Sequence, residues 1–105
     1  AILPTETTLL HAWSQDEPWM EYEGDGEISS CMAGEVMNTV KNRQNEYTVR
    51  ILHQDGYESV YSGLSNVCVQ EGQSVASGTA IVTMAGVDAF ELRKDGLSVM
   101  PVFGR

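Results

Sequence analysis

Basic residues, histidine and cysteine are all scarce in this chain, and long apolar runs are missing. Six Lys and Arg stand against fifteen Asp and Glu, which gives a formal net charge of −9. Nucleic acids and anionic membrane surfaces attract basic patches, so this balance argues against both as partners. No run approaches the roughly 18 apolar residues of a membrane-spanning helix. The 105 residues, of which 42% are hydrophobic and 20% charged, are enough for one globular domain.

The few histidines and cysteines restrict the metal sites and catalytic groups that the chain can build. His11, His53, Cys31 and Cys68 are the complete set, without a CxxC or a Cys/His cluster, so a structural zinc site is not expected. We expect His53 to be a strand residue beside a hairpin and His11 to be a surface or packing residue. The two cysteines form one disulfide or remain free thiols, and Cys68, between two valines, favours a buried small side chain. No G-x-S-x-G motif supports a serine nucleophile.

Strand-forming residues separated by turn signals run through most of the chain. The strand candidates are residues 34–40, 47–53, 58–61, 79–84, 89–93 and 97–100. Asp55-Gly56 and Asp95-Gly96 lie between such candidates, and a two-residue hairpin of this type needs positive φ at both positions. No twelve-residue segment carries a capped, helical apolar stripe. We therefore predict an all-β fold, a compact antiparallel β-sandwich or barrel-sandwich with short loops.

A repeated spacing of glycine and valine marks residues 67–81. Gly72 and Gly78 stand six residues apart, and each follows a valine, Val69 or Val75, by three positions. Glycine permits a tight corner at positive φ, and the valine between two corners can fill the core. The run predicts short strands joined by tight corners.

The order of these motifs carries a family resemblance. Gly34-Glu35-Val36, the stretch 49–65, the glycine–valine run and Phe90 to Gly96 follow one another over about residues 28–101. In this order the chain resembles the LytM/lysostaphin-type peptidoglycan endopeptidases and, among them, the sporulation domains of the stage II protein Q type. The resemblance implies one domain, with an N-terminal arm and shortened first motif at residues 1–27 and a LytM-like β core at residues 28–105.

The family's zinc site is the point where this chain departs from the pattern. Members hold zinc with an "H-x-x-x-D" motif and the second histidine of "H-x-H", and use two more histidines in catalysis. Here the "Y-x-H-L" histidine is replaced by Gly63, and the "H-x-H" positions fall on Val87 and Ala89. The shortened first motif offers Glu23 and Glu27. The resemblance thus implies a degenerate member with no catalytic residue, no metal and no cofactor, the zinc having been lost.

Acidic residues near these positions leave one metal-binding alternative open. Glu23, Asp25 and Glu27 alternate along an extended segment, and Asp88 lies within the second motif. Carboxylates favour hard cations such as calcium over zinc. A solvated acidic rim that keeps the domain soluble is the simpler interpretation.

The resemblance leads to an expected function of binding. We expect a catalytically inactive, extracytoplasmic scaffold domain, at the cell surface or in an intermembrane space, that serves the cell envelope or sporulation. A protein partner would add to an exposed strand edge, peptidoglycan would bind weakly, and an anchoring segment would lie outside this chain. One alternative is an active zinc endopeptidase that uses Glu23, Glu27 or Asp88 as ligands. Another is a lipoyl- or biotinyl-carrier-like module, although neither Lys41 nor Lys94 has the usual hairpin setting.

Overall fold

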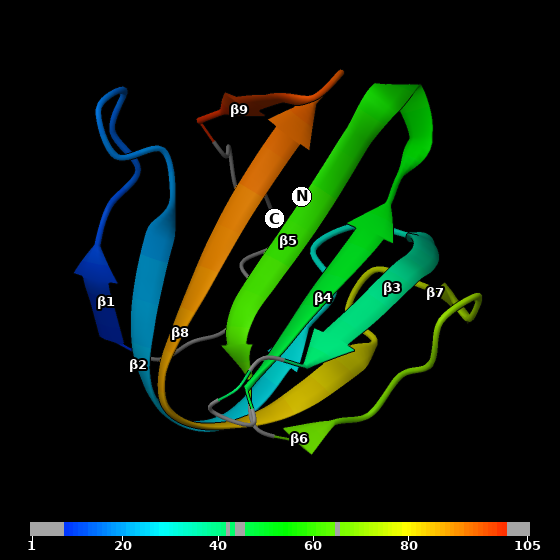
Figure 1. Ribbon diagram of the computed structural model, residues 1–105, viewed down its shortest axis with the longest axis horizontal. Coiled ribbons are helices and arrows are strands. Elements are labelled where there is room, and N and C mark those ends of the chain that lie inside the picture. The colour runs from blue at the N-terminus through cyan, green and yellow to red at the C-terminus, as the bar shows by residue number, and fades with distance from the viewer. Residues whose placement is uncertain (1–7, 42, 44–45, 65, 101–105) are drawn as a thin grey trace.

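The structure is a computed structural model that describes residues 8–41, 43, 46–64 and 66–100, with the backbone alone at 8–9, 24–27, 66 and 82–87 (Figure 1). Its strands are β1 (Thr8–His11), β2 (Met20–Ser29), β3 (Gly34–Lys41), β4 (Tyr47–Leu52), β5 (Tyr57–Leu64), β6 (Asn66–Val67), β7 (Ser74–Val75), β8 (Ala80–Lys94) and β9 (Leu97–Val99). A single 3-10 turn, η1 (Gln54–Gly56), joins β4 to β5. No helix in this part of the chain has the length and apolarity to cross a membrane.

All strand pairs are antiparallel and belong to one curved sheet, in the order β1-β2-β8-β5-β4-β3-β7, with β6 and β9 added to β8. Figure 1 shows β2 and β8 bending together, so that their lower halves pass behind β3 and β4. The sheet therefore closes over its own inner face. The largest fully buried side chains there are Tyr61, Phe90, Ile28, Ile51, Leu64, Ile81, Val36 and Val49. The prediction of an all-β, compact antiparallel fold is confirmed.

The two Asp-Gly pairs between strand candidates, Asp55-Gly56 and Asp95-Gly96, form the turns that the sequence predicts. Asp55 and Gly56 have φ values of 62° and 78°, and Asp95 and Gly96 have φ values of 52° and 85°. The two turns also contact each other, because the Asp95 amide donates to the Gly56 carbonyl at 2.9 Å. The turn ends of the β4–β5 and β8–β9 hairpins are thereby joined.

The glycine–valine run forms the corners that its spacing predicts. Gly72 and Gly78 have φ values of 87° and 88°, so both adopt the left-handed conformation. Val69 before the first glycine, Val75 between the two and Ile81 after the second are all buried. This part of the prediction is confirmed.

The sheet extends further along the chain than the sequence pattern indicated. Residues 79–84 and 89–93, expected as two strands, belong to the single fifteen-residue strand β8. β2 runs from Met20 to Ser29 and pairs with β8 over its whole length, so the sheet continues through the expected division between residues 27 and 28. Gly24, Gly26 and Gly86 weaken the local β pattern, but pairing between long neighbouring strands overrides that propensity.

The cysteines do not form a disulfide with each other, and the burial of Cys68 differs from the expectation. Cys31 is buried and Cys68 is exposed. The prediction of a buried Cys68 was wrong. Successive residues of an extended segment point to opposite sides, so Val69 enters the core and Cys68 faces outward.

Candidate functional site

The positions that match the family's second zinc motif lie in the middle of the sheet. On β8, Ala89 lies opposite Glu21 of β2 and opposite Ser62 of β5. Two residues earlier, Val87 lies opposite Glu23. Because alternate residues of a strand share a face, the two β8 positions and the two glutamates occupy the same side of the sheet. The second motif and part of the shortened first one are thus neighbours in space.

Gly63, which the resemblance assigns to the "Y-x-H-L" histidine position, follows Ser62 on β5. Its φ of 77° is unusual within a strand and interrupts the regular register between β4 and β5. A histidine could occupy this backbone conformation only with strain, because a Cβ disfavours positive φ. The local backbone, as well as the side chain, therefore differs from what a histidine here would adopt without strain.

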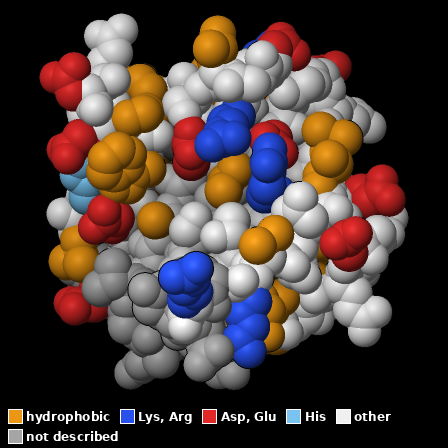
Figure 2. Space-filling model, in the orientation of Figure 1, with side chains coloured by type: hydrophobic (Ala, Val, Ile, Leu, Met, Phe, Trp, Pro, Cys, Tyr) orange, Lys and Arg blue, Asp and Glu red, His pale blue; other side chains and the backbone are white. Residues whose placement is uncertain are grey.

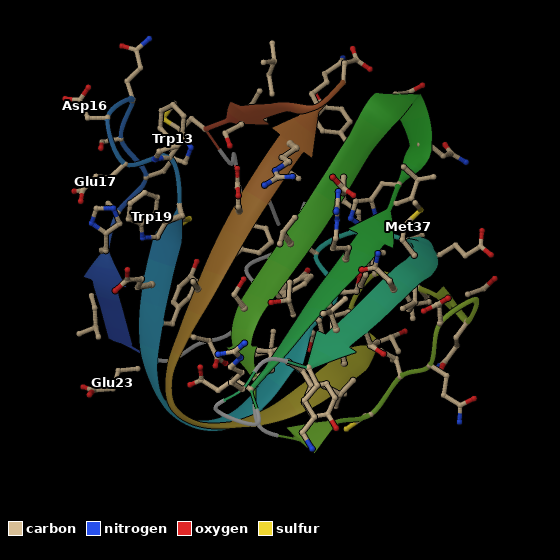
Figure 3. The ribbon with its side chains drawn as sticks, viewed as in Figure 1. Trp13, Asp16, Glu17, Trp19, Glu23 and Met37 are labelled. Atoms are coloured by element: carbon tan, nitrogen blue, oxygen red, sulfur yellow. The ribbon has the colours of Figure 1, made fainter. Side chains whose placement is uncertain are left out.

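Glu23 and Glu27 occupy different stretches of β2. Glu23 is exposed, and in Figure 3 its side chain projects to the β1 side of the strand. Glu27 pairs with Thr83, four positions along β8 from Val87, which corresponds to about 13 Å along a strand. The side chains of Glu27 and Val87 lie outside the described part of the chain. The register brings Glu23, and not Glu27, alongside the second motif.

The donor set at these positions does not fit a catalytic zinc. Gly63 and Ala89 have no side-chain atom that can ligate a metal, and a valine side chain contains no nitrogen, oxygen or sulfur. Zinc sites of catalytic type use three nitrogen, sulfur or carboxylate ligands and one open position. Among the described residues, no group of three His, Cys, Asp or Glu side chains could hold a metal ion. No reaction step is therefore assigned to a metal here.

The space beside Ala89 is a hollow of about 240 Å³, lined by Trp19, Val60, Ser62, Ala89, Phe90 and Glu91. The Trp19 indole N–H donates to Oε2 of Glu21 at 2.7 Å, and the His11 ring packs on the Trp19 ring with centroids 5.3 Å apart. The predicted packing role of His11 is thus confirmed. Figure 3 shows Trp13 and Trp19 together at the start of β2, with Asp16 and Glu17 at the outer side of the same loop. The sequence analysis did not identify Trp19 and Glu21 as site residues. The available signal was their spacing of two, which places both side chains on the same side of an extended segment.

A ladder of ion pairs crosses the neighbouring part of this face (Figure 2). Arg50 of β4 donates to Glu58 of β5 at 2.8 and 3.0 Å, and Arg93 of β8 lies 4.0 Å from the same glutamate. Arg93 also donates to both oxygens of Glu91, at 3.1 and 3.2 Å, and the Ser98 hydroxyl donates to Glu91 as well. The charges of β4, β5 and this end of β8 are therefore compensated within the sheet.

His53 belongs to a buried polar chain on the inner side of the sheet. Burial lowers its pKa, and the Ala33 carbonyl and Glu58 oppose that shift only in part. In the neutral ring, Nδ1–H donates to the Ala33 carbonyl at 2.8 Å, and Nε2 accepts from the Ser59 hydroxyl. The Cys31 thiol lies 3.2 Å from the same hydroxyl. His53 sits beside the hairpin as expected and fastens the β2–β3 connection to β4 and β5.

Glu23 gives a direct test of the acidic rim. Because its side chain is exposed, Glu23→Gln is expected to change the free energy of unfolding by less than about 0.5 kcal/mol. Urea titration of the two proteins in the presence of EDTA and then of calcium would measure this. A loss above about 1 kcal/mol, or a calcium-dependent difference, would show that the carboxylate holds a cation or a structural contact.

Comparison with known proteins agrees with this geometry. The sequence profile described as Peptidase family M23 matches residues 20–101. Stage II sporulation protein Q of Bacillus subtilis (strain 168) is 31% identical over 87 residues, which are 74% of this chain and 31% of that protein. The chain thus spans about a third of the length of this relative.

Two solved structures share the fold. A chain of the SpoIIQ-SpoIIIAH pore forming complex superposes with a TM-score of 0.70 and 28% identity, over 78% of this chain and 60% of that one. A zinc containing peptidase from Vibrio cholerae superposes with a TM-score of 0.82 at 15% identity, over 96% of this chain and 39% of that one. The profile match covers most of the chain, and with the strand register and the sporulation relative it identifies the chain as a member of peptidase family M23.

Proposed function

We propose that this chain is a non-catalytic, extracytoplasmic M23 domain that binds a protein partner in the cell envelope during sporulation. The observation that carries the proposal is the residue set at the family's metal and catalytic positions, where Gly63, Val87 and Ala89 replace histidines. Stage II sporulation protein Q, which is 31% identical to this chain, is a sporulation protein. One of the similar solved structures is a SpoIIQ-SpoIIIAH complex. Binding a partner requires none of the lost histidines.

The free side of β3 is the partner-binding edge in this proposal. β7 pairs with β3 only at Gly34 and Glu35, and Val36 then exchanges backbone hydrogen bonds with residues 72 and 73. From Met37 onward, β3 has no further strand on this side among the residues described. Met37 is 46% exposed and Val40 is 56% exposed on this stretch, and Figure 3 shows Met37 at that side of the sheet. An uncovered strand edge with apolar side chains can accept an additional strand from another protein.

A larger hollow, of about 600 Å³, adjoins the same edge. It lies between the start of β3, the end of β4 and η1, and its lining includes Glu35, Leu52, Asp55 and Tyr57. Leu52 is 43% exposed beside Glu35, its partner in the register. A partner strand on β3 would therefore have an adjacent concave surface with both apolar and acidic side chains, which suits anchoring residues from the partner.

Isothermal titration calorimetry tests this proposal. The probe is the soluble domain of the SpoIIIAH-like protein encoded by the same genome. We expect a saturable complex, at least tenfold weakened by Met37→Glu with Val40→Glu, because each change places a charge in an apolar contact. Leu97→Glu is the matched control, since Leu97 is 73% exposed on β9 and should leave binding unchanged. No complex, equal weakening by the control, or cleavage of purified peptidoglycan by the wild type would overturn the proposal.

A further inference from the structure

The hollow at Ala89 exists because a small side chain stands between larger neighbours. Ala89 is flanked in the register by Glu21 on one side and Ser62 on the other, and Val60 and Phe90 complete the apolar part of the lining. Trp19 overhangs it from the start of β2. An alanine at the centre of a sheet face leaves an open depression between its neighbours, and here the depression has a volume of about 240 Å³. It is large enough for one long side chain from another molecule.

Glu21 places a negative charge beside this hollow. Glu21 is partly buried, and its Oε2 accepts the Trp19 indole N–H at 2.7 Å, which fixes the carboxylate next to the hollow. Glu91, which lines the hollow, is already paired with Arg93. Within the described part of the chain, no Lys, Arg or His forms an ion pair with Glu21. A half-buried carboxylate beside an indole and an apolar floor is the environment that a cation completes.

We propose that this hollow binds a lysine side chain of a protein partner. The apolar floor of Val60 and Ala89 suits the aliphatic stem of lysine, and the indole and the Glu21 carboxylate suit its ammonium group. Because Trp19 already occupies Oε2, the carboxylate presents its other oxygen, which matches a point-like ammonium better than the two-pronged guanidinium of arginine. The chain's net charge of −9 favours approach of a basic segment.

The lysine-pocket inference depends on the proposed function in one respect: it takes the bound lysine to belong to a protein partner. The lysine pocket lies on the sheet face around β8, whereas the proposed partner-binding edge is β3, three strands away in the sheet order. Partner binding that survives loss of the lysine pocket would overturn this inference alone. Failure of any partner to bind, with lysine binding intact, would overturn the proposed function alone.

The test uses the indole N–H signals of the intact ¹⁵N-labelled protein, which has two tryptophans, Trp13 and Trp19. The probe is Nα-acetyl-lysine methylamide, with the norleucine and arginine analogues as comparisons. We expect the Trp19 signal to shift saturably with lysine, the Trp13 signal to stay in place, and norleucine to cause no saturable shift. An equal response to norleucine, tighter binding of arginine, or no saturable shift at Trp19 would overturn the inference.

Two variants and a control connect the response to the pocket. Glu21→Gln keeps an oxygen to accept the Trp19 N–H but removes the charge, and is expected to weaken lysine binding at least fivefold. Ala89→Leu fills the hollow and is expected to abolish the shift, with thermal melting to show that the protein is folded. Glu23→Gln removes an exposed charge from the same strand and should leave lysine binding unchanged. If Glu21→Gln and Glu23→Gln weakened lysine binding equally, the effect would come from the general negative charge of the surface, and the proposed pocket would be overturned.

Discussion

Replacing Gly34 by alanine is expected to lower the unfolding midpoint by about 15 °C, which corresponds to about 3 kcal/mol for a domain of this size. A Cβ at Gly34 would lie 2.3 Å from the Leu52 carbonyl oxygen, 2.8 Å from His53 Nδ1 and 3.0 Å from Ile51 Cγ2. The first of these atoms is backbone and the third is in the core, so neither can move without displacing β4. The His53 contact would also disturb the polar chain that holds the β2–β3 connection.

Gly72→Ala is the matched control for this prediction. Gly72 has a φ of 87°, and a Cβ there meets no atom within 4 Å, so alanine would cost only the strain of a left-handed backbone, about 1–2 kcal/mol. Thermal melting followed by circular dichroism compares the two variants. If Gly34→Ala cost no more than Gly72→Ala, the close approach of Gly34 to the end of β4 would be incorrect.

Asp88→Asn is expected to stabilise the protein at neutral pH. The Asp88 side chain is 3% exposed, and its Oδ2 has no hydrogen-bond partner among the residues that the structure describes. Burial, with a smaller contribution from Glu46, raises its pKa from 3.8 to about 6. Tyr22, opposite Asp88 in the register, stays neutral because burial and then Cys31 raise its pKa to about 12. At pH 7.5 the native state therefore contains a buried carboxylate that forms no ion pair within the described part of the chain.

The sign of the pH dependence follows from the raised pKa of Asp88. Between pH 3.8 and about 6 the native state binds more protons than the unfolded state, so this group's stabilising contribution is complete below 3.8 and is lost as the pH rises through 6. A shift of this size amounts to about 3 kcal/mol. Urea titrations at pH 4 and 7.5 measure this loss. From pH 4 to 7.5 the free energy of unfolding of the wild type is expected to fall by about this amount relative to that of Asp88→Asn. The same pH response in both proteins would contradict a buried, uncompensated Asp88.

The features that were predictable from the sequence depend on local chemistry. An Asp-Gly pair between two strand patterns favours a turn with positive φ, so both hairpin turns at Asp55 and Asp95 were found from the residues alone. The valine and glycine spacing between Val69 and Ile81 located the corners for the same reason. Motif order also led to the expectation that Gly63 and Ala89 stand at family histidine positions, because the order of motifs can survive where the ligand types do not.

The features that were not predictable depend on pairing between distant segments. The glycines of β2 and β8 hid the length of both strands, which becomes clear only from the register between Met20–Ser29 and β8. That register also selects Glu21 as the carboxylate opposite Ala89, a choice that motif spacing within the shortened first motif could not make. Burial of Asp88 likewise follows from which face of β8 turns inward, and not from its neighbours in sequence.

Zinc stoichiometry tests the central claim most directly. The purified protein would be equilibrated with excess zinc, desalted and analysed for metal, with the zinc containing peptidase from Vibrio cholerae treated identically as the positive control. A domain with Gly63, Val87 and Ala89 at the former histidine positions is expected to retain no stoichiometric zinc. One zinc per chain that survives desalting, and that is lost on Glu21→Gln or Glu23→Gln substitution, would contradict the non-catalytic account and show a rebuilt metal site on this face of the sheet.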